Sequence, residues 1–169
     1  GIDVGVDGGT HTIEVSGNTV ESNLDTNILV TASGAAVVEL HIDDNVVNGG
    51  ALTTVNEGIR VEFSGGSIMN DSSINGNTVR NHGGDGTQLL FDASTVNTLE
   101  VNANTMDFNA RNGLNFIFTD SPLNDLTIAD NPSFSINGAD GINFDMDNSN
   151  ITGMLIDNNG FAPPPPPPP

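Results

Sequence analysis

A short phrase recurs six times along this chain and restricts its fold more than any other feature. The phrase consists of an apolar residue (Ser72 in the third copy), any residue, a second apolar residue, two further residues and an asparagine. The six asparagines are Asn18, Asn45, Asn77, Asn104, Asn131 and Asn159, and they are spaced by 27, 32, 27, 27 and 28 residues. A regular period between about 20 and 50 residues indicates stacked repeats, none of which can bury its apolar side alone.

Each repeat also contains segments in which apolar and polar residues alternate, which is the pattern of half-buried β-strands. These segments begin near Ile2, Ile28, Ile59, Thr87, Leu114 and Ile142. A further apolar column is expected eight residues before each asparagine after the first (Val37, Met69, Val96, Leu123, Ile151). Another is expected two residues after each of the six asparagines (Val20, Val47, Val79, Met106, Phe161), with Ser133 as the exception. Turns rich in Gly and Asn separate the segments, because these residues accept a positive φ. The sequence therefore predicts short strands joined by sharp corners, without helices.

The Gly-Ile-x-Val strand starts, the Ile-x-x-Asn phrases and the length of the repeat resemble the right-handed parallel β-helix family. This solenoid is shared by pectate lyases, polygalacturonases, phage tailspikes and many bacterial surface proteins. The resemblance implies an all-β, right-handed parallel β-helix (solenoid) of about six coils, with ~27–28 residues per coil. It covers residues 1–162. Residues 163–169 are all proline and predict a polyproline II tail, interpreted as a linker to a further module.

The charge balance limits the partners of such a rod. Sixteen Asp and six Glu stand against three Arg and no Lys, so the net charge is -19. This surface would repel phosphate backbones and anionic lipids, so we expect no nucleic acid partner and no membrane insertion. The absence of Cys excludes disulfides and thiolate metal sites. Because the chain opens at Gly1 without Met, we expect it to have been processed or cut from a longer protein.

The asparagine column Asn18, Asn45, Asn77, Asn104, Asn131 and Asn159 is interpreted as structural. Buried amides stacked one above another can satisfy the backbone groups of a corner, whereas a buried polar group without partners costs about 1–3 kcal/mol. Catalysis would instead need unlike groups that converge on one point.

Counting back from the asparagines predicts which side chains face outward. Glu14, His41 and Asp43 fall on one face, and a carboxylate and imidazole cluster of this kind can bind a metal or perform acid-base chemistry. Resemblance to polygalacturonases and pectate lyases implies a polysaccharide-active enzyme, a lyase or a glycoside hydrolase, as the alternative function. In those enzymes, acidic residues act together with a basic substrate clamp, and this chain has no Lys and no Arg-x-Lys element. A charged surface with an incidental histidine is the favoured interpretation.

Two other groups of residues are candidates for binding. Asp85 lies in a glycine-rich turn that resembles half of a calcium-binding repeat, and Asp145 with Asp147 offers further oxygen ligands, so calcium is the cofactor that the sequence leaves open. Leu90 and Ile117 are expected side by side on the outer face of the strands that begin at residues 87 and 114. A stacked apolar pair of this kind is a candidate surface for lateral packing.

We therefore expect an extracellular structural or adhesive module of a bacterial cell surface. Its expected partners are copies of itself, which would stack end to end into a filament, or neighbouring modules of the same surface protein, and carbohydrate. An enzymatic role is the weaker alternative.

Overall fold

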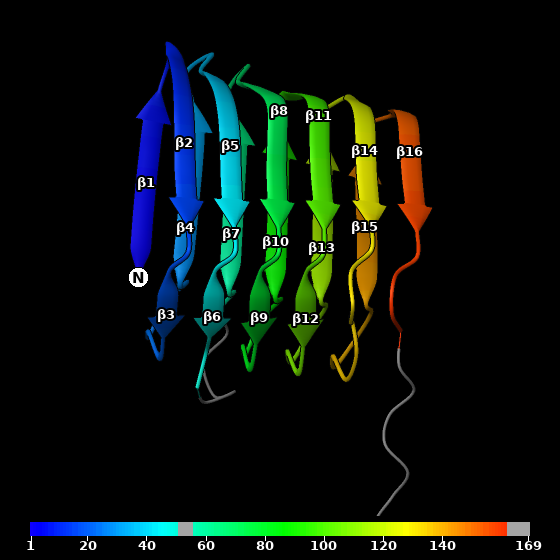
Figure 1. Cartoon of the computed structure of the whole chain (residues 1–169). Coiled ribbons are helices and arrows are strands. Elements are labelled where there is room, and N and C mark those ends of the chain that lie inside the picture. Colours follow the sequence, from blue (N-terminus) through cyan, green and yellow to red (C-terminus); the bar gives the residue numbers. More distant parts are fainter. Residues whose placement is uncertain (51–55, 162–169) are drawn as a thin grey trace, which may run out of the picture.

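The computed structural model describes residues 1–50 and 56–161. The chain forms a parallel β-solenoid of about six coils, and no helix occurs within these residues (Figure 1). Successive coils lie side by side in sequence order, so that β1 (Ile2–Asp7) is at one end of the row and β16 (Ile151–Asp157) is at the other. The predicted all-β solenoid with coils of about 27 residues is confirmed.

Three parallel sheets run along the rod. The first contains β1, β4 (Ile28–Ser33), β7 (Ile59–Ser64), β10 (Thr87–Asp92), β13 (Leu114–Thr119) and β15 (Ile142–Asp147). The second contains β2 (Thr10–Ser16), β5 (Val37–Asp43), β8 (Ile68–Asn75), β11 (Thr95–Asn102), β14 (Leu123–Ala129) and β16. The third is short and contains β3 (Thr19–Glu21), β6 (Val46–Asn48), β9 (Thr78–Arg80) and β12 (Thr105–Asp107).

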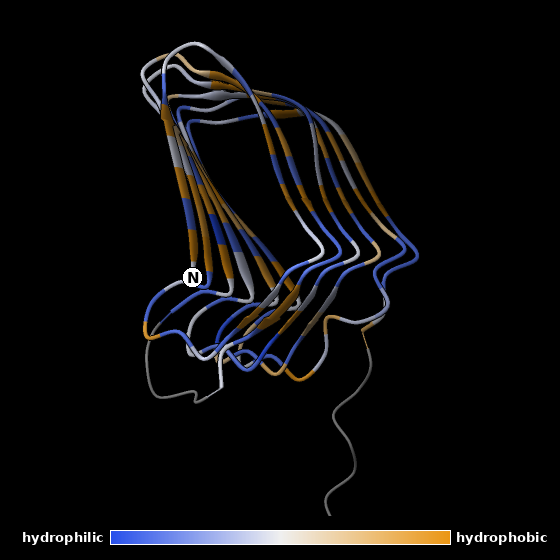
Figure 2. Ribbon diagram, turned by 60° about the vertical axis from the view of Figure 1, so that its left-hand side comes forward, coloured by the Kyte–Doolittle hydropathy of each residue, from blue (hydrophilic) through white to orange (hydrophobic). Residues whose placement is uncertain are grey.

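The core consists of inward columns in which equivalent residues of successive coils contact one another. Apolar and polar residues alternate along the strands, as the bands of colour in Figure 2 show. Two columns of the first sheet change from small aliphatic to aromatic residues along the rod, and Phe91 stacks on Phe118 while Phe116 stacks on Phe144, with ring centroids 4.9 and 4.7 Å apart. These columns are Val4, Val30, Val61, Leu89, Phe116, Phe144 and Val6, Ala32, Phe63, Phe91, Phe118, Met146.

The asparagine column forms a ladder of hydrogen bonds from coil to coil. Asn104 has no exposed surface. Its Oδ1 accepts from the backbone N and the Nδ2 of Asn77 at 2.9 and 3.0 Å, and its Nδ2 donates to the carbonyl of Ile74 at 2.7 Å. The same contacts recur around Asn45, Asn77, Asn131 and Asn159. Each amide thus joins its own corner to that of the preceding coil.

The residue before each asparagine has a left-handed backbone conformation, which produces the corner. The φ angles are 66° at Gly17, 57° at Asp44, 67° at Gly76, 57° at Ala103, 53° at Asp130 and 49° at Asn158. Gly, Asn and Asp tolerate this region best, so the predicted turn chemistry holds at every corner of this column except that of Ala103.

The spacing of 32 residues between Asn45 and Asn77 predicts a bulge of about five residues within residues 48–56, but the structure divides these extra residues between two places. Ile28 pairs with Ile59, which shows that four extra residues lie between β6 and β7. The fifth extra residue lies inside β8, where the register with β5 shifts between Glu39 and His41. Residues 51–55 of the expected bulge, and the predicted tail at 163–169, lie outside the described residues.

The shift inside β8 corrects one predicted column. Val38, rather than Val37, pairs with Met69, and Val38 is fully buried whereas Val37 is partly exposed. The exception at Ser133 also has a structural reason. Ser133 forms only an isolated bridge with Thr105, and the next residue, Phe134, is 3% exposed and stacks on Phe161 with 5.8 Å between ring centroids.

Candidate functional site

The outward column that contains His41 runs along the second sheet. Glu14 pairs with His41, His41 with Ser73, and Ser16 with Asp43, all on the outer face of the second sheet. The column continues through Glu100, Thr127 and Leu155. The structure therefore brings Glu14, His41 and Asp43 to one face.

The hydrogen bonds of His41 include two partners that the sequence did not single out. Its Nδ1 is 2.9 Å from Ser73 Oγ, and its Nε2 is 3.3 Å from Glu39 Oε1. Ser73 Oγ in turn donates to the carboxylate of Asp43, with distances of 3.1 and 3.0 Å to the two oxygens. Ser73 lies four residues before Asn77, as His41 lies four before Asn45, whereas Glu39 reaches His41 along its own strand, so column counting alone could have found only Ser73.

A hollow of about 350 Å³ lies beside these residues, at the place where β8 holds its extra residue. Asp71 has a φ of 40°, and Ser72 is turned inward, where its Oγ accepts from the backbone N of Leu40 at 3.0 Å. The hollow is lined by His41, Asp71, Ser72, Ser73, Asn75, Thr98 and Glu100. Its walls are therefore hydroxyl, amide, imidazole and carboxylate groups, which suit a hydroxylated ligand.

The contacts of Ser73 limit what this cluster can do chemically. A serine hydroxyl has one proton, and the contact with Asp43 can use it. The same hydroxyl lies 2.9 Å from His41 Nδ1, and its single proton can go either to Asp43 or to this nitrogen. A serine activated as a nucleophile needs the second arrangement, in which the imidazole accepts.

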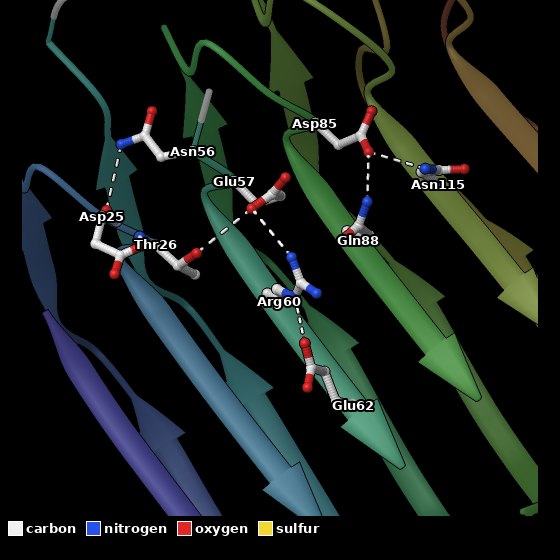
Figure 3. Close-up of polar contacts among 9 residues, drawn as sticks. All are labelled: Asp25, Thr26, Asn56, Glu57, Arg60, Glu62, Asp85, Gln88 and Asn115. Carbon is white, nitrogen blue, oxygen red and sulfur yellow. Dashed lines mark hydrogen bonds and ion pairs between the residues drawn. The ribbon is translucent and has the colours of Figure 1, made fainter. Parts of the chain in front are cut away.

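A second polar network lies on the outer face of the first sheet (Figure 3). Arg60 Nε contacts Glu62 Oε1 at 2.5 Å, and Arg60 Nη1 is 3.7 Å from Glu57 Oε2. Thr26 Oγ1 also donates to Glu57 Oε2, at 3.4 Å. Arg60 and Glu62 are both partly exposed, and ion pairs of this kind contribute little, typically about 0–1 kcal/mol. Arg60 and Glu62 therefore form a surface ion pair, and Glu57 joins Arg60 to Thr26.

Asp85, the first calcium candidate, is fully buried, and N–H donors surround its carboxylate. Oδ1 accepts from the backbone N and the Nδ2 of Asn112, both at 2.9 Å. Oδ2 accepts from Gln88 Nε2 at 3.0 Å and from Asn115 Nδ2 at 2.8 Å, as Figure 3 shows. A carboxylate has about four lone-pair sites, so a calcium ion could bind here only by displacing donors.

The other calcium candidates, Asp145 and Asp147, lie exposed on the same face of β15. Across residues 1–50 and 56–161, no group of three or more His, Asp or Glu side chains is arranged to hold a metal ion. Leu90 and Ile117 are direct neighbours in adjacent strands, as expected. Both side chains are partly exposed on the outer face, and Glu62 and Asp145 continue their column on either side.

His82 is a titratable residue whose burial no pattern in the sequence predicts. It has no exposed surface, and burial lowers the pKa of its imidazole to about 4, with only a weak opposing effect from a 3.5 Å contact of Nε2 with the carbonyl of Val47. Its Nδ1 has no hydrogen-bond partner within the described part of the chain. In the following coils Asn109 and Asn137 occupy the equivalent corner.

Comparison with protein-family models, with curated proteins and with solved structures gives no match. The assignment of the fold as a parallel β-solenoid therefore rests on the pairing of the strands. In the described ranges, no helix is long and apolar enough to cross a membrane.

Proposed function

We propose that this chain is an extracellular structural and adhesive solenoid module whose copies stack end to end into a surface filament. The observation that carries the proposal is the state of the two ends. Within residues 1–50 and 56–161, β1 and β2 at one end, and β15 and β16 at the other, are each paired on one side only. Unpaired edges of parallel strands offer a row of N–H and C=O groups to another chain.

The end that carries β16 also exposes residues of the core columns. Met154 and Ile156 are 51% and 45% exposed. Their equivalents one coil earlier, Leu126 and Ile128, are fully buried. Covering this end with a further coil would bury apolar surface, and burial is favourable by about 25 cal/mol per Å². The acidic sides of the rod, with a net charge of -19 over the whole chain, favour contact through the ends instead of the sides.

Electron microscopy of the purified chain at rising concentration tests the stacking directly. We expect rods one solenoid wide that lengthen with concentration, and a matching rise of mean mass in sedimentation. Persistent monomers at all concentrations would refute the proposal. The adhesive part is tested separately by binding of the chain to immobilised polysaccharides, since carbohydrate is the expected ligand.

The second candidate is a polysaccharide-active enzyme, a lyase or a glycoside hydrolase. The observation that favours it is the polar hollow beside His41, Ser73 and Asp43, which suits a hydroxylated ligand. Turnover assays with uronate polymers discriminate between the candidates. Product that is formed by the wild type and lost in the Asp43→Asn variant would establish the enzyme and overturn the structural proposal.

A further inference from the structure

The two ends of the solenoid match one another residue by residue. When the first sheet is continued past β15 with the register of the existing coils, the next strand equivalent to β15 is β1 of a second copy. Phe144 then meets Val4 and Met146 meets Val6, so both inward apolar columns continue without interruption.

The asparagine ladder also matches across such a junction. Asn159 lies at the exposed end of the ladder, and its backbone N donates to no acceptor within residues 1–50 and 56–161. At the opposite end, Asn18 Oδ1 accepts no hydrogen bond from the described residues. In every internal step the amide oxygen of one coil accepts from the asparagine N–H of the coil before it. Asn18 of a second copy would therefore complete the contact that Asn159 lacks.

The second sheet joins a long strand to a short one at this junction. Leu155 follows Ile151 by four positions in β16, whereas the equivalent Glu14 follows His11 by three positions in β2. The pair β5 and β8 already accommodates the same difference inside the molecule. From Glu14 onward the registers agree, and Ile156 meets Val15.

We infer that a second copy of this chain docks its first coil onto the sixth coil in this register, and that the pair Asp7 and Asp147 limits the strength of the junction. Among the aligned positions of β15 with β1, and of β16 with β2 from Glu14 onward, this is the only directly opposed pair of like charges. Each of the other charged residues faces an uncharged one: Asp3 faces Asn143, Asp145 faces Gly5, Glu14 faces Leu155 and Asp157 faces Ser16. The inference rests on the proposed end-to-end stacking and adds the partner surface and its register.

The magnitude follows from the spacing of neighbouring strands. Two carboxylates on adjacent strands lie about 5 Å apart, and like charges at that distance repel by an amount that changes an association constant about fourfold in bulk water, and more where water is partly excluded. Replacing one carboxylate with an ammonium group converts repulsion into attraction. We therefore expect Asp147→Lys, and separately Asp7→Lys, to raise the association constant at pH 7 by about tenfold or more.

A charge-swap cycle distinguishes direct contact from a general effect of net charge. The double variant Asp7→Lys with Asp147→Lys restores like charges, so its association should fall back to about the wild-type value. Asp92→Lys is the matched control, because Asp92 occupies the same outward column in the middle of the rod and removes the same charge. Sedimentation velocity over a concentration series measures all five proteins.

Each outcome bears on the inference. Single variants that associate more strongly than Asp92→Lys, together with a double variant that does not, support it. A double variant that associates more strongly than either single variant, or a control equal to them, shows an effect of net charge alone and overturns the inference while stacking stands. Monomers for every variant at every concentration refute both the junction and the proposed stacking.

Discussion

Substitution of Asn104 by Ala is the sharpest test of how the coils are held together. Asn104 has no exposed surface, and its amide contacts both neighbouring coils. The change would remove the acceptor of the Asn77 backbone N–H and the donor to the Ile74 carbonyl, which are 2.9 and 2.7 Å away. Each buried group left without a partner costs about 1–3 kcal/mol, so we expect a loss of about 3–5 kcal/mol in the free energy of unfolding.

Asn97 provides a matched control in the same coil. Its side chain also bonds to the coils on both sides, at 2.6 Å from Asn70 and 2.8 Å from Asn124, but it is partly exposed on the outer face. Water can replace both contacts, so Asn97→Ala should cost less than about 1 kcal/mol. The two variants remove the same side chain and differ in the environment of the groups left behind.

Urea unfolding followed by far-ultraviolet circular dichroism measures both losses. With a typical urea dependence of about 2 kcal/mol per M, Asn104→Ala should lower the midpoint by roughly 2 M and Asn97→Ala by under 0.5 M. Asn104→Asp should cost at least as much as Asn104→Ala, because a buried charged oxygen would face the Ile74 carbonyl. Equal midpoints for Asn104→Ala and Asn97→Ala would refute the view that the buried ladder holds the corners.

Three further substitutions test other residues. The pKa of His82 is lowered from 6.5 to about 4, so the folded state binds fewer protons than the unfolded state between these values, and stability should fall by about 3 kcal/mol as the pH drops from 6.5 to 4. His82→Asn, which installs the residue found at the equivalent corner of Asn109, should remove most of this slope in unfolding curves measured across that range. Asp85→Ala should cost about 3 kcal/mol in calcium-free buffer, because four N–H donors lose their acceptor. A thermal shift assay that finds a loss only in the presence of calcium would show instead that Asp85 binds this ion. Ile136 has a φ of 57° and is 42% exposed, so Ile136→Gly should raise stability by about 0.5–1 kcal/mol, and an unchanged melting temperature would contradict the assigned strain.

The columns could be predicted well from the sequence because every strand residue in register with the asparagines can be located by counting from them. The pairing of Glu14 with His41, and of Leu90 with Ile117, followed from counting alone. Counting could not locate the five extra residues of the long coil, since the spacing between Asn45 and Asn77 gives their sum and not their positions. It therefore placed Val37 where Val38 lies.

The environments of individual side chains were harder to predict. Asp85 and His82 lie in corners, where burial depends on which residues of the neighbouring coils pack against them. The amides that surround Asp85 come partly from Asn112 and Asn115, which are 27 and 30 residues away in the sequence. A periodic pattern reports which face a strand residue lies on, but it carries no comparable information for corner residues.

The long coil contains two insertions, and the coils that follow it repeat only one of them. The four residues added between β6 and β7 are not repeated, because β9 and β10, like β12 and β13, are joined by short corners. The single residue added inside β8 is present again in β11, β14 and β16, where Val96, Leu123 and Ile151 all precede their outward partners by four residues. The length of a corner loop can thus change in one coil alone, whereas the extra residue inside β8 recurs in every later strand of the same sheet. An insertion in this rod therefore stays local at a corner but extends along the sheet when it lies within a strand.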